Sequence, residues 1–187
     1  MRKINLLCLL LISSIWSQAQ TIIEEATLPN EVVFNGEELV INGAGLREKF
    51  FFDIYAGALY VKNKSKKASE IANADETMAV KVHILSGMMT RKKLGSALRD
   101  GFVKSTNNNV APLQKRLEKF ISFVTEEIEV GQVFDMVYIK GKGCVLYKNG
   151  VEKGYVEGLD FKKALFNIWL GNKPVDKDLK KEMLGII

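Results

Sequence analysis

The sequence predicts an α+β protein in which an antiparallel sheet and the helices occupy separate segments of the chain. Three observations support this fold class. Runs of β-branched and aromatic residues occur beside Asn-Gly dipeptides, which are typical of tight hairpin turns. Apolar residues recur at helical spacing in the middle of the chain and again near its end. The 187 residues, 47% of them hydrophobic, are enough for one domain with a sizeable core.

Residues 1–19 are predicted to be a secretory signal peptide. They begin with two basic residues, continue with an apolar run from Leu6 to Trp16, and end in the small-x-small cleavage sequence SQA. The apolar run is shorter than the roughly 18 residues that a membrane-spanning helix needs. We therefore expect a mature domain of residues 20–187, without a stable membrane anchor, in the periplasm or outside the cell.

The strand-type segments are expected in the following order. Residues 24–30 form a polar lead-in, and short strands at 31–34 and 39–41 flank a turn at Asn35-Gly36. Residues 77–85 alternate apolar and polar side chains, as a half-buried strand does. Three later strands, connected by glycine-containing turns, form an antiparallel meander at residues 133–139, 144–147 and 151–156.

Helix-type segments fill the gaps between these strands. Thr90 is the expected N-cap of an amphipathic helix, and Pro112 begins a second one. The remaining helices are expected at residues 68–74, at residues 159–169 before the stop signals Gly171 and Pro174, and from Asp176 to Leu184.

The composition argues against several classes of protein. The formal net charge of +5 falls to about +3 when the two basic residues of the signal peptide are removed, which does not suggest nucleic-acid binding. Cys144 is the single cysteine of residues 20–187, so it cannot form an internal disulfide, and we expect it in a strand core. His83 is the only histidine, and the residues for a His and Cys metal site are lacking. No metal and no cofactor is predicted.

Residues 42–62, NGAGLREKFFFDIYAGALYVK, form the segment on which any function should depend. Arg47 follows a turn expected at Gly43 and Gly45, and a nearly continuous apolar strand is expected from Phe50 to Val61. The small residues at 56–58 leave room for another backbone or a ligand. Two interpretations remain open: a plain core strand with Arg47 paired to an acid such as Glu48 or Asp53, or a strand that faces a cavity.

The sequence GAGLR leading into a strand that ends in LYV, and the later corner IWLGNKP, resemble the chalcone isomerase-like family. The similarity is greatest to its bacterial secreted members and to the plant fatty-acid-binding relatives, and it covers nearly all of residues 20–187. It implies an open-faced β-sandwich, in which helices cover one side of a large antiparallel sheet and the ligand lies in a cleft between them.

The resemblance also implies roles for individual residues. Arg47 matches the family's arginine, which faces the substrate in the isomerases and meets the lipid carboxylate in the fatty-acid-binding relatives. Tyr55 matches a threonine of the true isomerases and a tyrosine of the lipid-binding relatives. No tyrosine occurs at residues 86–91, where the catalytic tyrosine of the isomerases should lie. Residues 95–98 and Ile168 stand where the isomerases have an asparagine and a hydroxyl.

An arginine with a nearby tyrosine can hold a carboxylate through several hydrogen bonds, and flexible methionines adapt to an acyl chain. No catalytic residue is assigned. The predicted ligand-binding residues are Arg47, Tyr55, Tyr60, Met88, Met89 and Thr90, with further cavity walls at Phe51, Leu98, Phe102 and Phe120.

Three functional hypotheses follow. The first is a secreted, non-catalytic protein that binds a small hydrophobic carboxylate such as a fatty acid. The alternative is an intramolecular lyase of the chalcone isomerase type with an altered active site, which the missing tyrosine at residues 86–91 disfavours. A third is an accessory protein that kept the fold and lost the ligand, in which Arg47 is structural.

Overall fold

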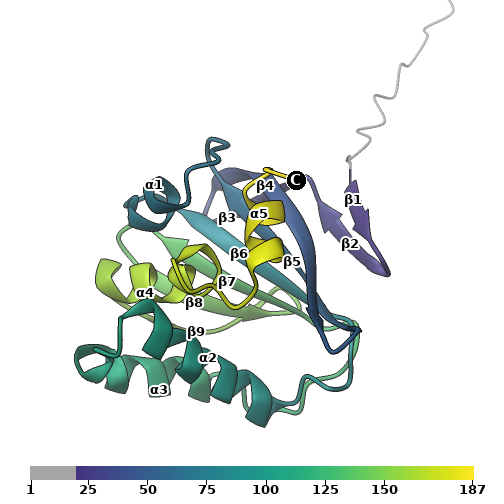
Figure 1. Ribbon diagram of the computed structural model, residues 1–187. Coiled ribbons are helices and arrows are strands. Elements are labelled where there is room, and N and C mark those ends of the chain that lie inside the picture. The colour runs from purple at the N-terminus through teal and green to yellow at the C-terminus, as the bar shows by residue number, and fades with distance from the viewer. Residues whose placement is uncertain (1–19) are drawn as a thin grey trace, which may run out of the picture.

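The computed structural model describes residues 20–187, so the predicted signal peptide lies outside the described residues. Seven antiparallel strands form one curled sheet, and they follow one another in the sheet in chain order (Figure 1). These strands are β3 (Glu31–Phe34), β4 (Glu37–Lys49), β5 (Phe52–Val61), β6 (Met78–Ile84), β7 (Val133–Ile139), β8 (Gly143–Lys148) and β9 (Val151–Val156). A separate hairpin of β1 (Gln20–Ile23) and β2 (Ala26–Pro29) precedes them.

The helices are inserted between strands and after the last strand, and they cover one side of the sheet (Figure 1). They are α1 (Ala68–Asn73), α2 (Arg91–Ser105), the 3₁₀ turn η1 (Ala111–Leu113), α3 (Gln114–Ser122), α4 (Leu159–Leu170) and α5 (Lys177–Met183). The predicted α+β architecture, a large antiparallel sheet covered on one side by helices, is confirmed. No helix within residues 20–187 is long and apolar enough to cross a membrane.

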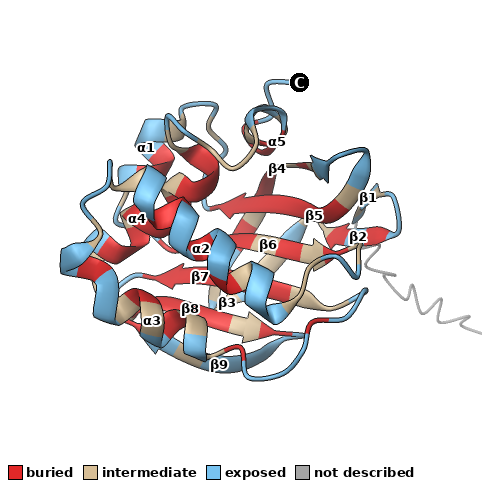
Figure 2. Cartoon of the chain, turned by 60° about the horizontal axis from the view of Figure 1, so that its bottom comes forward, coloured by how far each residue is buried: buried red, intermediate tan, exposed pale blue. Residues whose placement is uncertain are grey.

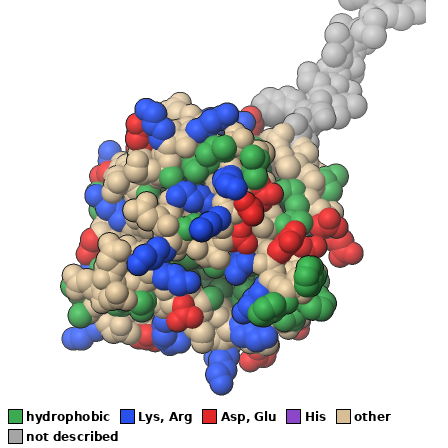
Figure 3. Space-filling model, in the orientation of Figure 1, with side chains coloured by type: hydrophobic (Ala, Val, Ile, Leu, Met, Phe, Trp, Pro, Cys, Tyr) green, Lys and Arg blue, Asp and Glu red, His purple; other side chains and the backbone are tan. Residues whose placement is uncertain are grey.

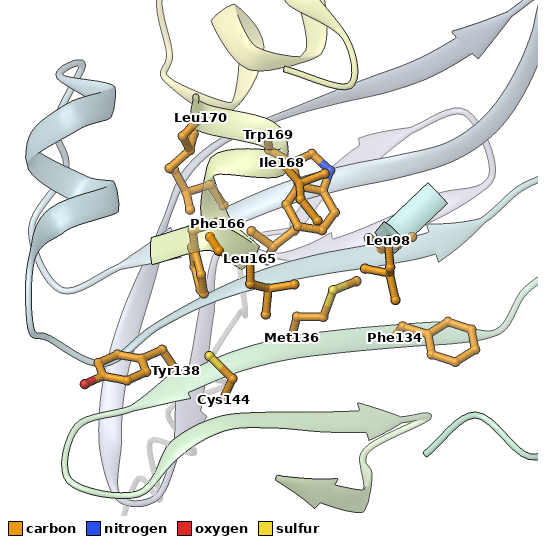
Figure 4. Close-up of a cluster of buried hydrophobic side chains, with 14 of the residues drawn as sticks. Leu98, Phe134, Met136, Tyr138, Cys144, Leu165, Phe166, Ile168, Trp169 and Leu170 are labelled. Atoms are coloured by element: carbon orange, nitrogen blue, oxygen red, sulfur yellow. The ribbon is translucent and has the colours of Figure 1, made fainter. Parts of the chain in front are cut away.

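The main core lies between the sheet and the helices, where buried residues are concentrated (Figure 2). Alternate residues of β6, such as Val80 and Val82, face the helices and pack in this core. From the other side, α4 contributes Ile168 and Trp169, which project toward the sheet above Met136 (Figure 4). Cys144 is fully buried in the same core, as expected from the sequence.

The opposite face of the sheet has a smaller core of its own. Ala26 and Leu28 of β2 are fully buried there and pack with Tyr60 and Val137. The prediction that residues 24–30 form a polar lead-in is therefore wrong. In β2, buried Ala26 and Leu28 alternate with exposed Thr27. The strand has four residues and follows a charged turn, so this alternation is too short to identify a strand from the sequence.

The hairpin of β4 and β5 differs from the expectation in its turn. Gly43 and Gly45 lie inside β4 and form no turn. They are glycines for another reason, because α5 packs directly on them: a Cβ atom at Gly43 would overlap the backbone carbonyl of Glu182. The chain reverses instead at Phe50 and Phe51, which have positive φ angles of 50° and 66°. The apolar strand therefore begins at Phe52, and Phe51 is fully exposed and is no cavity wall.

Candidate functional site

A cavity of about 310 Å³ lies between the sheet and the helices α2 and α4. This volume is at the lower end of the range for small-molecule sites. Figure 3 shows hydrophobic atoms at the bottom of a hollow on this face, with Lys and Arg side chains around it. The apolar lining residues are Ile54, Val82, Ile84, Met88, Met89, Leu94, Ala97, Leu98, Phe134, Met136, Ile168, Trp169 and Val175. The polar lining residues are Arg47, Lys49, Tyr55, Lys93, Ser96 and Asp100.

Arg47 and Tyr55 lie side by side in this lining. They are directly opposite each other in the register of β4 and β5, so their side chains leave the sheet on the same face. Tyr55 is buried, and the Arg47 side chain is 21% exposed. The sequence prediction that these two residues meet at one cavity agrees with this geometry.

The Tyr55 hydroxyl is protonated and can donate a hydrogen bond. The indole Nε1 of Trp169 donates a hydrogen bond to the Tyr55 oxygen at 3.1 Å. Burial raises the pKa of Tyr55 to about 12, an effect that the Trp169 hydrogen bond and the charge of Arg47 only partly oppose. The phenol therefore keeps its proton near neutral pH. Since the hydroxyl oxygen accepts from Trp169, that proton is available to a ligand oxygen.

The Arg47 guanidinium is paired with Asp176, which is 129 residues further along the chain. Arg47 Nη1 donates to Asp176 Oδ2 at 2.9 Å and also to the backbone carbonyl of Glu48. Asp176 at the same time caps α5, because its Oδ1 accepts from the backbone N–H groups of Asp178 and Leu179. The interpretation in which Arg47 pairs with an acid named Glu48 and Asp53 as examples, and the acid that Arg47 meets is Asp176.

Part of the guanidinium remains open to a ligand. Both hydrogen bonds that Arg47 makes with residues 20–187 use Nη1. Nε and Nη2 still carry N–H donors, and a guanidinium has five such donors in a planar fork. A ligand carboxylate can therefore bind beside Asp176 or take its place.

The other predicted ligand-binding residues divide into two groups. Met88 and Met89 line the cavity. Thr90 does not line it; its hydroxyl accepts from Lys93 N and caps α2. Tyr60 does not line it either, and its hydroxyl donates to the Pro29 carbonyl at 2.8 Å on the opposite face of the sheet. The reason is geometric, because the odd separation of five residues puts Tyr55 and Tyr60 on opposite faces of one strand.

Among the additional predicted walls, only Leu98 lines the cavity. Phe102 and Phe120 belong to the core beneath the helices, where each packs against the Phe161 ring. Leu98 and Phe102, one turn apart, lie on the same face of α2, where Leu98 lines the cavity and Phe102 packs on Phe161 of α4.

The sequence interpretation missed two residues that shape the site, Trp169 and Asp176. A buried tryptophan needs an acceptor for its N–H, so Trp169 in the corner IWLGNKP was a signal for a polar partner nearby. Asp176 was predicted correctly as the first residue of a helical segment. Nothing local indicated that its carboxylate would also meet Arg47, since that contact depends on how α5 packs on β4.

The cavity lining also includes residues from the segments that the resemblance matched with the isomerase machinery. Met88 and Met89 line it from the segment before α2, Ala97 lines it from α2, and Ile168 lines it from α4. Of the residues that line the cavity in the described part of the chain, Tyr55 is the only tyrosine.

The fold and the site together define a class: an open-faced β-sandwich with a largely apolar cleft between sheet and helices. The chain belongs to the chalcone isomerase-like family, whose sequence profile matches residues 20–185. A solved structure with the same fold is that of a fatty-acid-binding protein of Arabidopsis thaliana. It is similar over 89% of this chain and 96% of its own, with a TM-score of 0.71 and 16% sequence identity. No curated protein sequence matches the chain.

Proposed function

We propose that the protein binds a fatty acid or a similar amphiphilic carboxylate and does not transform it. The observation that carries the proposal is the pair of Arg47 and Tyr55 in the wall of an apolar cavity. A guanidinium with open donors and a neutral phenol provide charge-assisted hydrogen bonds to a carboxylate. The methionine and leucine side chains then provide an adaptable surface for the acyl chain.

The comparison with known structures supports the same class of ligand. The Arabidopsis protein that shares this fold is described as a fatty-acid-binding protein. The likeness is one of fold, so the argument for a carboxylate in this chain depends on Arg47 and Tyr55 themselves.

Mass spectrometry of lipids extracted from the natively purified protein tests this proposal. We expect a long-chain carboxylic acid in near-stoichiometric amount, and the same acid should rebind after delipidation. A protein that carries no such lipid, and that binds no fatty acid in a titration, would contradict the proposal and favour an accessory protein without a ligand.

We expect no chalcone isomerase activity. Ring closure needs stabilisation of a phenolate and a proton donor beside the developing enolate. By the resemblance, Met88, Ala97 and Ile168 come from the segments that correspond to this machinery, and these apolar side chains, which line the cavity, supply neither. The assay follows the loss of a chalcone above its spontaneous rate, and enzyme-dependent, stereoselective closure would revive the intramolecular-lyase hypothesis.

We further propose that the protein acts outside the cytoplasm, in the periplasm or after secretion. The support is the basic start, the apolar run and the cleavage sequence of residues 1–19. The intact mass of the exported protein should correspond to a chain that begins near Gln20. A cytoplasmic product that retains Arg2 and Lys3 would contradict this.

A further inference from the structure

Three consecutive phenylalanines form the tip of the β4–β5 hairpin and are exposed to solvent. Phe50 is 75% exposed, Phe51 103% and Phe52 57%. Single exposed apolar residues are common on protein surfaces. A group of adjacent exposed aromatic side chains instead indicates a site that contacts a membrane or another protein. The tip therefore needs an explanation outside the folding of this chain.

The turn itself does not require phenylalanine. Two other hairpins of the protein have Asn-Gly at the same two turn positions, with φ angles of 52° and 76° at Asn35-Gly36 and of 51° and 76° at Asn149-Gly150. The Phe50-Phe51 turn has nearly the same angles, 50° and 66°. Positive φ is unfavourable for a bulky residue and easy for asparagine or glycine. The aromatic rings thus stand where local backbone preferences favour other residues.

The tip adjoins the mouth of the cavity. Lys49, the last residue of β4, lines the cavity and also places its ammonium over the Phe50 ring, 5.5 Å from the ring centre. Met88 lines the same cavity and is 36% exposed, so apolar wall reaches the surface there. One end of the cavity lining therefore lies beside the exposed rings.

We propose that the hairpin tip inserts into the surface of a lipid bilayer and that the cavity exchanges its ligand with that bilayer. This inference deepens the proposed function and rests on it for the nature of the ligand. Aromatic side chains favour the boundary between acyl chains and headgroups, and the Lys49 ammonium can stay at headgroup level while the rings enter.

The hairpin tip itself carries no net charge. The two cations on β4 near the tip, Arg47 and Lys49, are balanced by Glu48 and by Asp53, which face each other across the hairpin. Attraction to anionic lipid needs an excess of basic residues. The tip should therefore bind vesicles of neutral phosphatidylcholine, and added salt should weaken the binding little.

The decisive variant replaces both turn residues, Phe50→Asn with Phe51→Gly, because this dipeptide suits the turn and removes the rings. Co-flotation of the mature protein with phosphatidylcholine vesicles should show clear binding for the wild type and a loss of about tenfold or more for the variant. The melting temperature of the variant should be equal or higher, which separates loss of binding from unfolding. The control is Val151→Ser, because Val151 is also an exposed apolar residue, 59%, beside another hairpin turn. The control should bind vesicles like the wild type.

A second measurement separates this inference from the proposed function. The affinity for a fatty acid dissolved in buffer should be unchanged in the double variant, while its transfer rate from vesicles should fall. Wild-type protein that stays unbound to vesicles, or a double variant that floats as well as wild type, overturns the inference. So does a concentration-dependent dimer that the double variant abolishes, if no vesicle binding accompanies it. Vesicle binding by a protein that takes up no fatty acid would overturn the proposed function and the exchange of that ligand, whereas insertion of the tip into the bilayer would stand.

Discussion

Replacing Arg47 with alanine is expected to abolish tight binding of a fluorescent fatty acid without unfolding the protein. Removal of one partner from a hydrogen-bonded charge pair costs roughly 2 kcal/mol or more, about a thirtyfold rise in Kd. The fold should survive, because the Arg47–Asp176 ion pair has side chains 21% and 19% exposed. Loss of such a partly buried pair should cost more than the roughly 1 kcal/mol of an exposed pair and less than the roughly 3–5 kcal/mol of a buried one. The measurements are a fluorescence titration for binding and urea unfolding for stability.

Asp176→Asn is the matched variant that distinguishes ligand binding from a structural ion pair. Asparagine is as good an N-cap as aspartate, so α5 should keep its first turn. The substitution removes the carboxylate that competes with a ligand for the Arg47 guanidinium, so the affinity for a fatty acid should be unchanged or higher. If Asp176→Asn loses binding as strongly as Arg47→Ala, or if Arg47→Ala leaves binding intact, Arg47 is a structural residue and the binding proposal loses its main support.

The sequence was sufficient for the parts of the fold that depend on local chemistry. Alternation predicted β6, the Asn-Gly dipeptides predicted two of the hairpin turns, and Thr90 and Asp176 marked the starts of two helices. The assignment of both Tyr55 and Tyr60 to the ligand was wrong, although the sequence held the information to separate them. Five residues along a strand reverse the face, so only one of the two tyrosines could line a cavity.

The contacts that could not be predicted join distant segments. Gly43 and Gly45 looked like a turn, whereas they are small because α5, near the C-terminus, packs on β4. Lys162 of α4 is a second case, because lysine is rarely fully buried in proteins. It is fully buried, and its Nζ donates to the carbonyls at the end of α1, those of Ile71, Ala72 and Ala74. In each case the local sequence is compatible with several environments, and the tertiary packing selects one.

A second large effect is expected at the face of the sheet opposite the cavity, from Lys81→Met. Lys81 on β6 and Asp135 on β7 are cross-strand partners, with Nζ and Oδ1 2.5 Å apart and side chains only 12% and 5% exposed. Removal of the lysine leaves a buried carboxylate without its counter-charge, which typically costs about 3–5 kcal/mol. Urea unfolding at neutral pH should show a loss of this size, while fatty-acid binding by the folded fraction should persist, because the pair lies outside the cavity lining.

The pH dependence identifies the buried charge as the cause of that loss. Burial raises the pKa of Asp135, and Lys81 opposes the rise. Without Lys81 the pKa of Asp135 in the folded state rises further. The pH window of interest runs from about 4, the ordinary pKa of an aspartate, up to this raised pKa. Within that window the folded state binds more protons than the unfolded state. Stability then falls as pH increases through this window, and the difference between variant and wild type should be smallest at acid pH. Adding Asp135→Asn to Lys81→Met should recover much of the stability at neutral pH and remove the slope. A loss that is independent of pH, or one that the double variant does not reduce, would instead attribute the effect to the packing of the lysine stem.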